Sequence, residues 1–162
     1  MAAIDRSVAS LRIFGDILVP DDVSRILRAS PSLSHMKGDA RQSRSGAKVV
    51  EKTGMWLLRC DDQEPKNLNL QVAQLFAGLT SDLAAWNALA TDFEIDLFCG
   101  LFLRESNEGG TLSVATLKLL SERGVRIGFD IYGPECEIIE TAACPCKSGR
   151  TYAECCKPRS VA

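Results

Sequence analysis

Four of the seven cysteines crowd into thirteen residues near the C-terminus, in the order CxC, eight residues, CC: they are Cys144, Cys146, Cys155 and Cys156. Four thiolates in so short a stretch can close a tetrahedral four-cysteine site, the usual structural arrangement for Zn²⁺. Iron binds the same kind of ligand set, so the spacing alone leaves iron possible. The pattern therefore predicts a metal site, with zinc as the expected ion.

The residues around these cysteines agree with metal binding. Four thiolates and Zn²⁺ sum to a charge of −2, and four basic residues flank them: Lys147, Arg150, Lys157 and Arg159. Nearby cations favour the thiolate form by lowering the thiol pKa. A segment this short has no apolar core, so metal binding would supply its folding free energy. A redox pair or an incidental cysteine-rich terminus is the alternative interpretation.

The other three cysteines carry a weaker signal. Cys60 and Cys99 lie inside apolar runs and are expected in the core, where free cysteine behaves as a small hydrophobe. Cys136 follows a Gly-Pro turn signal, and the sequence around it favours neither core packing nor another role. The first ten residues lack the apolar stretch of a signal peptide, so we expect a cytoplasmic protein with reduced thiols.

Length and charge limit the classes of function. A chain of 162 residues fits one modest domain plus a tail. With 19 basic and 21 acidic residues, the formal charge of −2 gives the main domain no electrostatic basis for nucleic-acid binding. No apolar run approaches the roughly 20 residues that a membrane span needs. A protein partner is the remaining expectation, and the oligomeric state stays open.

The hydrophobic pattern predicts the elements that position these residues. Alternation predicts strands over 7–16, 92–104 and 125–131, and shorter strands at 48–52 and 54–60. Pro20 begins a short helix. Residues 67–89 form a long helical pattern with a bend or restart near Gly78. Residues 112–123 form a last helix, which ends before Gly124. Residues 33–47 are read as a short strand followed by a flexible loop.

The resulting order is β-α-β-β-α-β-α-β. It predicts the α+β class, with a single mixed or largely antiparallel sheet, helices packed on one face, and a small C-terminal zinc-binding tail. We expect an α+β domain over 1–133, a linker over 134–143, and the tail over 144–162.

Carboxylates are the other candidates for chemistry. Glu94 and Asp96 project from one face of a predicted strand, and Asp16 and Asp130 join them if their strands are neighbours. Such a group suits general acid–base work or cation binding, and an acidic sheet face also suits a basic protein partner. A solvated sheet face is the simplest interpretation. His35, the only histidine, is expected to face solvent from a basic loop, with no nucleophile pattern around it.

The tail CPCKSGRTYAECC (144–156) resembles the SEC-C motif, the small zinc-binding tail of the protein-export motor SecA and of many other bacterial proteins. The family pattern is usually written CPCGSGKKYKKCC. The ligand spacing, Pro145, the Ser148-Gly149 pair and Tyr152 match, whereas Lys147 and Ala153-Glu154 depart from it. The resemblance implies that the four cysteines named above ligate zinc.

Residues 10–133 resemble the bacterial family named Domain of Unknown Function 4279. The segments that carry the resemblance are LRIFGD (11–16) before Pro20, HMKGD (35–39), GMW (54–56), DLFCG (96–100) and DIY (130–132). This family implies a fold and no chemistry.

These observations favour a non-enzymatic cytoplasmic protein-binding or adaptor protein with a structural four-cysteine zinc site in its tail. One alternative is an immunity-type or regulatory protein that binds a basic partner through an acidic sheet face. A second alternative is a small enzyme that uses the carboxylates Glu94, Asp96 and Asp130, and a third is thiol redox chemistry at the tail.

Overall fold

The structure is a computed structural model. It describes residues 2–3, 6–43, 46–60, 67–105, 107–133, 143–144, 146 and 148–155. The expected linker falls almost wholly on residues 134–142, and these, together with Cys136 and Cys156, lie outside the described residues.

A five-stranded sheet with the strand order β3-β6-β2-β7-β9 forms the centre of the fold. The middle strand β2 (Arg6–Gly15) pairs antiparallel with β6 (Gly54–Arg59) on one side and with β7 (Glu94–Phe102) on the other. One edge strand, β3 (Leu33–His35), is antiparallel to β6. The other edge strand, β9 (Arg126–Tyr132), is parallel to β7, so the sheet is mixed.

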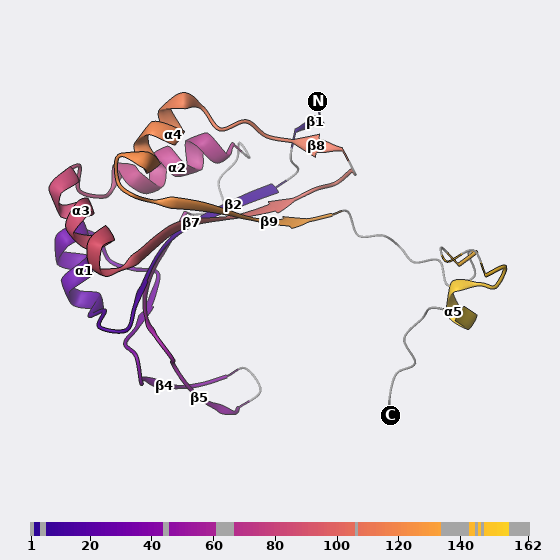
Figure 1. The fold of residues 1–162 in the computed structure, drawn as a ribbon, viewed down its shortest axis with the longest axis horizontal. Coiled ribbons are helices and arrows are strands. Elements are labelled where there is room, and N and C mark those ends of the chain that lie inside the picture. The colour runs from indigo at the N-terminus through magenta and orange to yellow at the C-terminus, as the bar shows by residue number, and fades with distance from the viewer. Residues whose placement is uncertain are drawn as a thin grey trace.

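Helices cover one face of this sheet (Figure 1). They are α1 (Pro20–Leu27), α2 (Leu68–Ala77), α3 (Leu83–Asp92) and α4 (Val114–Ser121). Helix α4 lies in the connection between β7 and β9, because two neighbouring parallel strands need a crossover. The α+β class and the placement of helices on one face, both predicted from the sequence, are confirmed.

Local signals explain where the helices begin and end. Pro20 stands in the first turn of α1, where its missing N–H costs no hydrogen bond. The long helical pattern at 67–89 divides into α2 and α3 because Asp82 caps a new helix, its carboxylate accepting from the amide of Ala84 at 2.9 Å. Gly124, which follows α4, has φ +65°, a conformation that side chains disfavour.

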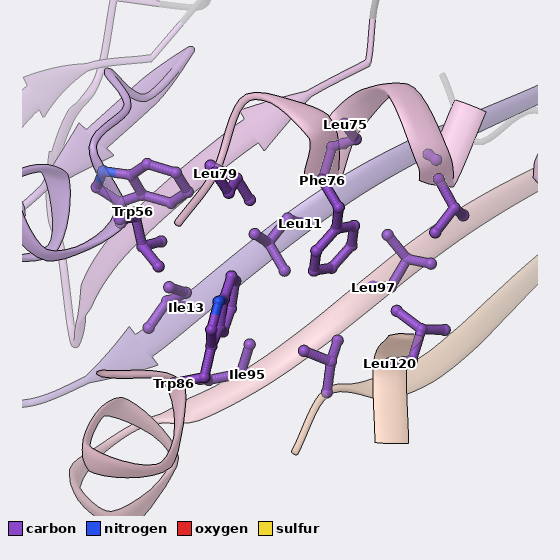
Figure 2. Packing of buried hydrophobic residues seen from close by; sticks show 14 of the residues in the cluster. Leu11, Ile13, Trp56, Leu75, Phe76, Leu79, Trp86, Ile95, Leu97 and Leu120 are labelled. Atoms are coloured by element: carbon purple, nitrogen blue, oxygen red, sulfur yellow. The ribbon is translucent and has the colours of Figure 1, made fainter. Parts of the chain in front are cut away.

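The core lies between the helices and the covered face of the sheet (Figure 2). Leu11 and Ile13 of β2 and Ile95 and Leu97 of β7 are almost completely buried. Alternate residues of a strand point to opposite faces, so these side chains share the face that the helices cover. Two tryptophans complete the cluster: Trp56 donates its indole N–H to Ser24 Oγ at 3.0 Å, and Trp86 donates to the Thr80 carbonyl at 2.9 Å.

Two short strand pairs contain strands that the sequence did not predict, although a short strand was expected at 48–52, where β5 lies. Strand β4 (Ala40–Gln42) pairs antiparallel with β5 (Lys48–Val50), so part of the segment expected as a loop is a hairpin. In Figure 1 this hairpin extends away from the helices. A second pair joins β1 (Ala2–Ala3) in parallel to β8 (Glu108–Gly109). Two- and three-residue strands carry too few residues for alternation to mark them.

Two cysteine predictions are confirmed. Cys99 is completely buried, and Cys60 is partly buried against the core cluster. Within the part of the chain that the structure describes, no helix is long and apolar enough to cross a membrane.

Candidate metal centre

The described part of the tail is a tight loop closed by backbone pairing. Ala143 and Thr151 form an antiparallel bridge, and the amide of Cys144 donates to the carbonyl of Arg150 at 2.8 Å. Between these ends Gly149 has φ +78°, which a residue with a side chain rarely adopts. The short helix α5 (Tyr152–Cys155) follows, and the loop and helix together bring the first cysteine pair against the third cysteine.

The Sγ atoms of Cys144, Cys146 and Cys155 all lie within 4.8 Å of one another. The Cys146 sulfur is 3.2 Å from that of Cys144 and 3.4 Å from that of Cys155. In a tetrahedral site with zinc–sulfur bonds of about 2.3 Å, neighbouring sulfurs are about 3.8 Å apart. The three thiols therefore fit a single metal ion after a spread of a few tenths of an ångström, and with the motif they indicate a C-terminal metal site.

The electrostatics of the loop favour a thiolate at Cys146. The Ser148 hydroxyl, then the thiols of Cys144 and Cys155, stabilise the charged form and lower the pKa of Cys146 from its ordinary value of 9.0 to about 6. Ser148 Oγ also donates to Cys155 Sγ at 3.2 Å. Because a metal binds the thiolate and not the thiol, this loop is prepared for metal capture near neutral pH.

The structure brings together three of the four predicted ligands. The fourth, Cys156, lies outside the described residues, so its role stays a prediction. The sequence pattern alone was sufficient to find the cluster, because the ligand spacing is short and local.

The carboxylates considered for acid–base chemistry or cation binding each have a partner of their own. Asp96 is bound at two points by Arg12, whose Nε and Nη2 donate at 2.8 Å each. Glu94 accepts from Arg126 at 2.9 Å. Asp130 lies opposite Gly100, four residues along β7 from Asp96 and so about 13 Å away.

The remaining two carboxylates also have partners elsewhere. Asp130 accepts from the hydroxyl of Tyr132 at 2.6 Å, which raises the pKa of Tyr132. Asp16 lies beyond the end of β2 and pairs with Lys37, whose hydrogen bond and charge lower the pKa of the Asp16 carboxyl. Glu94 and Asp96 do share one sheet face, as the strand pattern predicted, and Asp130 lies on the same face. The separate pairings give no support to a shared acid–base or cation site, whereas a solvated sheet face, the simplest interpretation, agrees with them.

The sheet face opposite the helices is not acidic either. By the strand register it carries four arginines, Arg6, Arg12, Arg59 and Arg126, beside the three carboxylates Glu94, Asp96 and Asp130. Aromatic rings separate these charges: Arg12 lies 4.4 Å from the ring centre of Phe98, Arg6 lies 3.9 Å from that of Phe102, and Phe102 stacks on Tyr132. Arginines outnumber carboxylates among these strand residues, which removes the argument for a basic partner.

His35 differs from its prediction as well. It lies on β3 with its side chain only 16% exposed, and its Nε2 is 3.8 Å from a carboxylate oxygen of Glu51. Arg41 pairs with the same carboxylate and lowers the pKa of Glu51. A three-residue strand inside a polar run shows too little hydrophobic periodicity to predict that the side chain of His35 is mostly buried.

Sequence reasoning missed a cavity of about 420 Å³ beside β9. Its apolar wall includes Leu101, Phe129 and Ile131, and Asn69 at the start of α2 also lines it. Asn69 joins α2 to the segment before α4, donating to the Thr111 carbonyl and accepting from the Ser113 amide, both at 2.8 Å. The only sequence signal for this cavity was the apolar alternation of β9, which continues past the part of the strand that a short helix can cover.

Comparison with known families accounts for nearly the whole chain. Residues 5–134 match the family model described as a domain of unknown function, DUF4279, and residues 141–158 match the SEC-C motif. No curated protein and no solved structure matches the chain significantly. The chain belongs to the DUF4279 family and carries a SEC-C motif at its C-terminus.

Proposed function

We propose that this protein is a non-enzymatic cytoplasmic adaptor whose tail holds one zinc ion and recognises a protein partner. The observation that carries the proposal is the convergence of three cysteine sulfurs within 4.8 Å inside a matched SEC-C motif. Cys144, Cys146 and Cys155 are three of the proposed ligands, and Cys156 is the proposed fourth. Zinc is favoured over iron because a closed set of four cysteines is the usual structural zinc site.

The metal would act as the folding core of the tail. Of its described cysteines, Cys144 is buried, whereas Cys146 and Cys155 are exposed. The loop is held in place by the Ala143–Thr151 bridge and the Cys144–Arg150 hydrogen bond. These few backbone contacts give little stability, so loss of the metal would unfold the surface that the partner recognises.

The bonding of the carboxylates supports a binding role for the main domain. Asp96, Glu94 and Asp130 each have a partner side chain, and none of the three lines the cavity beside β9. General acid–base chemistry needs positioned titratable groups within reach of a substrate. A domain with a large apolar core and a mixed aromatic and charged sheet face is better suited to contact with another macromolecule.

The experiment that tests this proposal is affinity capture from a native lysate with three baits: the wild-type chain, Cys146→Ser and Cys60→Ser. The last variant makes the same chemical change at a cysteine that packs against the core and is not a member of the cysteine cluster. We expect a partner that the wild type and Cys60→Ser retain and that Cys146→Ser loses, and a zinc chelator should release the same partner. A partner retained equally by all three baits would contradict the proposed role of the tail.

A further inference from the structure

The edge strand β9 has an apolar side that the described residues cover only in part. Phe129 and Ile131 are 47% and 61% exposed, although they lie on the sheet face that the helices cover elsewhere. Helix α4, which crosses between β7 and β9, adds two more exposed apolar residues, Val114 and Leu117. Exposed hydrophobic residues gathered on one edge indicate a contact surface, whereas scattered ones need no explanation.

Among the described residues, no strand pairs with the outer backbone edge of β9. The amide of Leu103 donates to the carbonyl of Tyr132 at 2.8 Å, so the peptide groups of Tyr132 and of alternate residues before it face β7. The N–H and C=O groups of Ile127, Phe129 and Ile131 therefore point to the open edge. Edge strands are usually protected by charged side chains, Pro or a bulge; β9 contains neither Lys nor Pro, and its two charged residues, Arg126 and Asp130, have opposite signs.

We infer that β9 pairs antiparallel with β9 of a second copy of this chain, about a twofold axis at Gly128. In this register the outward-facing N–H and C=O groups of Ile127 pair with those of Phe129 in the second copy. Gly128 then lies opposite Gly128 of the second copy. The sheets of the two chains then form one continuous ten-stranded sheet, which is the isologous arrangement of a C2 dimer.

Charge complementarity selects a second copy as the occupant. The same register sets Arg126 directly opposite the second copy's Asp130, and the symmetry makes this pair twice. Arg126 is 65% exposed even with Glu94 as its neighbour, so it is accessible to a second carboxylate. Glycine at the axis lets the two strands approach closely, because the non-hydrogen-bonded pairs of an antiparallel ladder have the shorter Cα separation.

Charge inversion tests the pairing. Arg126→Asp and Asp130→Arg each replace two attractive pairs with two repulsive ones, and the double variant Arg126→Asp/Asp130→Arg restores opposite charges. We expect the wild type to show a concentration-dependent dimer in sedimentation velocity, each single variant to raise the dissociation constant about tenfold, and the double variant to recover the dimer. Asp21→Arg, an equal charge change on α1, is the matched control and should dimerise as the wild type does.

A cross-link tests the register. A Cβ added at Gly128 would meet no atom within 4 Å, so Gly128→Cys is expected to fold. Two such thiols would lie across a pair with a Cα separation of about 4.5 Å, which suits a disulfide. With oxidised glutathione as oxidant, we expect a reducible dimer band for Gly128→Cys and none for Gly133→Cys, which lies beyond the strand.

Two results would overturn the inference. One is a wild-type chain that stays monomeric at several hundred micromolar, which would leave the edge open to a different occupant. The other is a dimer that neither single inversion weakens, which would place the interface elsewhere on the surface. Far-ultraviolet circular dichroism of every variant shows that a lost dimer is not a lost fold.

Discussion

Arg12 and Asp96 form a two-point ion pair that joins the central strand β2 to its neighbour β7. Nε and Nη2 of Arg12 donate to the two carboxylate oxygens of Asp96 at 2.8 Å each, and the side chains are 27% and 19% exposed. The guanidinium lies over the ring of Phe98. Asp96, a candidate for acid–base chemistry from the sequence, therefore forms a structural ion pair between two strands of the sheet.

This geometry predicts that Asp96→Asn destabilises the domain. The substitution removes the charge from a partly buried two-point pair, and we expect the free energy of unfolding to fall by about 1–2 kcal/mol. Urea denaturation measures the change. Glu94→Gln is the matched control, because Glu94 is 73% exposed and its pair with Arg126 should contribute less than about 0.5 kcal/mol. Equal losses for the two variants would mean that burial and two-point geometry do not matter here.

A second prediction concerns the pH at which the tail releases its metal. The pKa of Cys146 is lowered to about 6, so the thiolate is favoured above that pH and metal binding weakens as the pH falls through it. Ser148→Ala removes the first cause of the lowered pKa, and we expect the release midpoint to move upward by roughly one unit. A zinc-sensitive dye read across pH 4–8 measures the midpoint, and an unchanged midpoint would show that Ser148 does not tune the site.

A third prediction separates the cysteines by their reactivity. Burial, with the charge of Asp96 adding to it, raises the pKa of Cys99 to about 12, and the side chain is fully inaccessible. We expect iodoacetamide to leave Cys99 unmodified in the native protein and to alkylate Cys146 once a chelator has removed the metal. Peptide mass spectrometry measures both sites. Modification of Cys99 as fast as Cys146 under native conditions would contradict the described core.

The parts of the fold that the sequence predicted are those with strong local signals. The alternation around Ile95 and Leu97 marked β7, and the bend or restart expected near Gly78 marked the boundary between α2 and α3. The cysteine cluster was found for a similar reason, because a metal loop of thirteen residues needs no long-range contact to define it.

The parts that the sequence missed depend on contacts between distant segments. Asp96 meets Arg12 only because β2 and β7 are neighbours in the sheet, a pairing 84 residues apart in the chain. His35 is covered because its strand pairs with β6 and brings Glu51 within reach. Hydrophobic periodicity reports which face of an element is buried, but not which charged groups meet across it.

The most direct test of the account is the metal content of freshly purified protein, measured by elemental analysis for the wild type, Cys146→Ser and Cys60→Ser. We predict about one zinc per chain in the wild type and in Cys60→Ser, and a sharp fall in Cys146→Ser, because a four-cysteine site that loses one thiolate holds zinc far less tightly. Wild-type protein that contains stoichiometric disulfides and no metal when isolated under reducing conditions would contradict the zinc-holding tail. Iron in place of zinc would keep the site but change the ion.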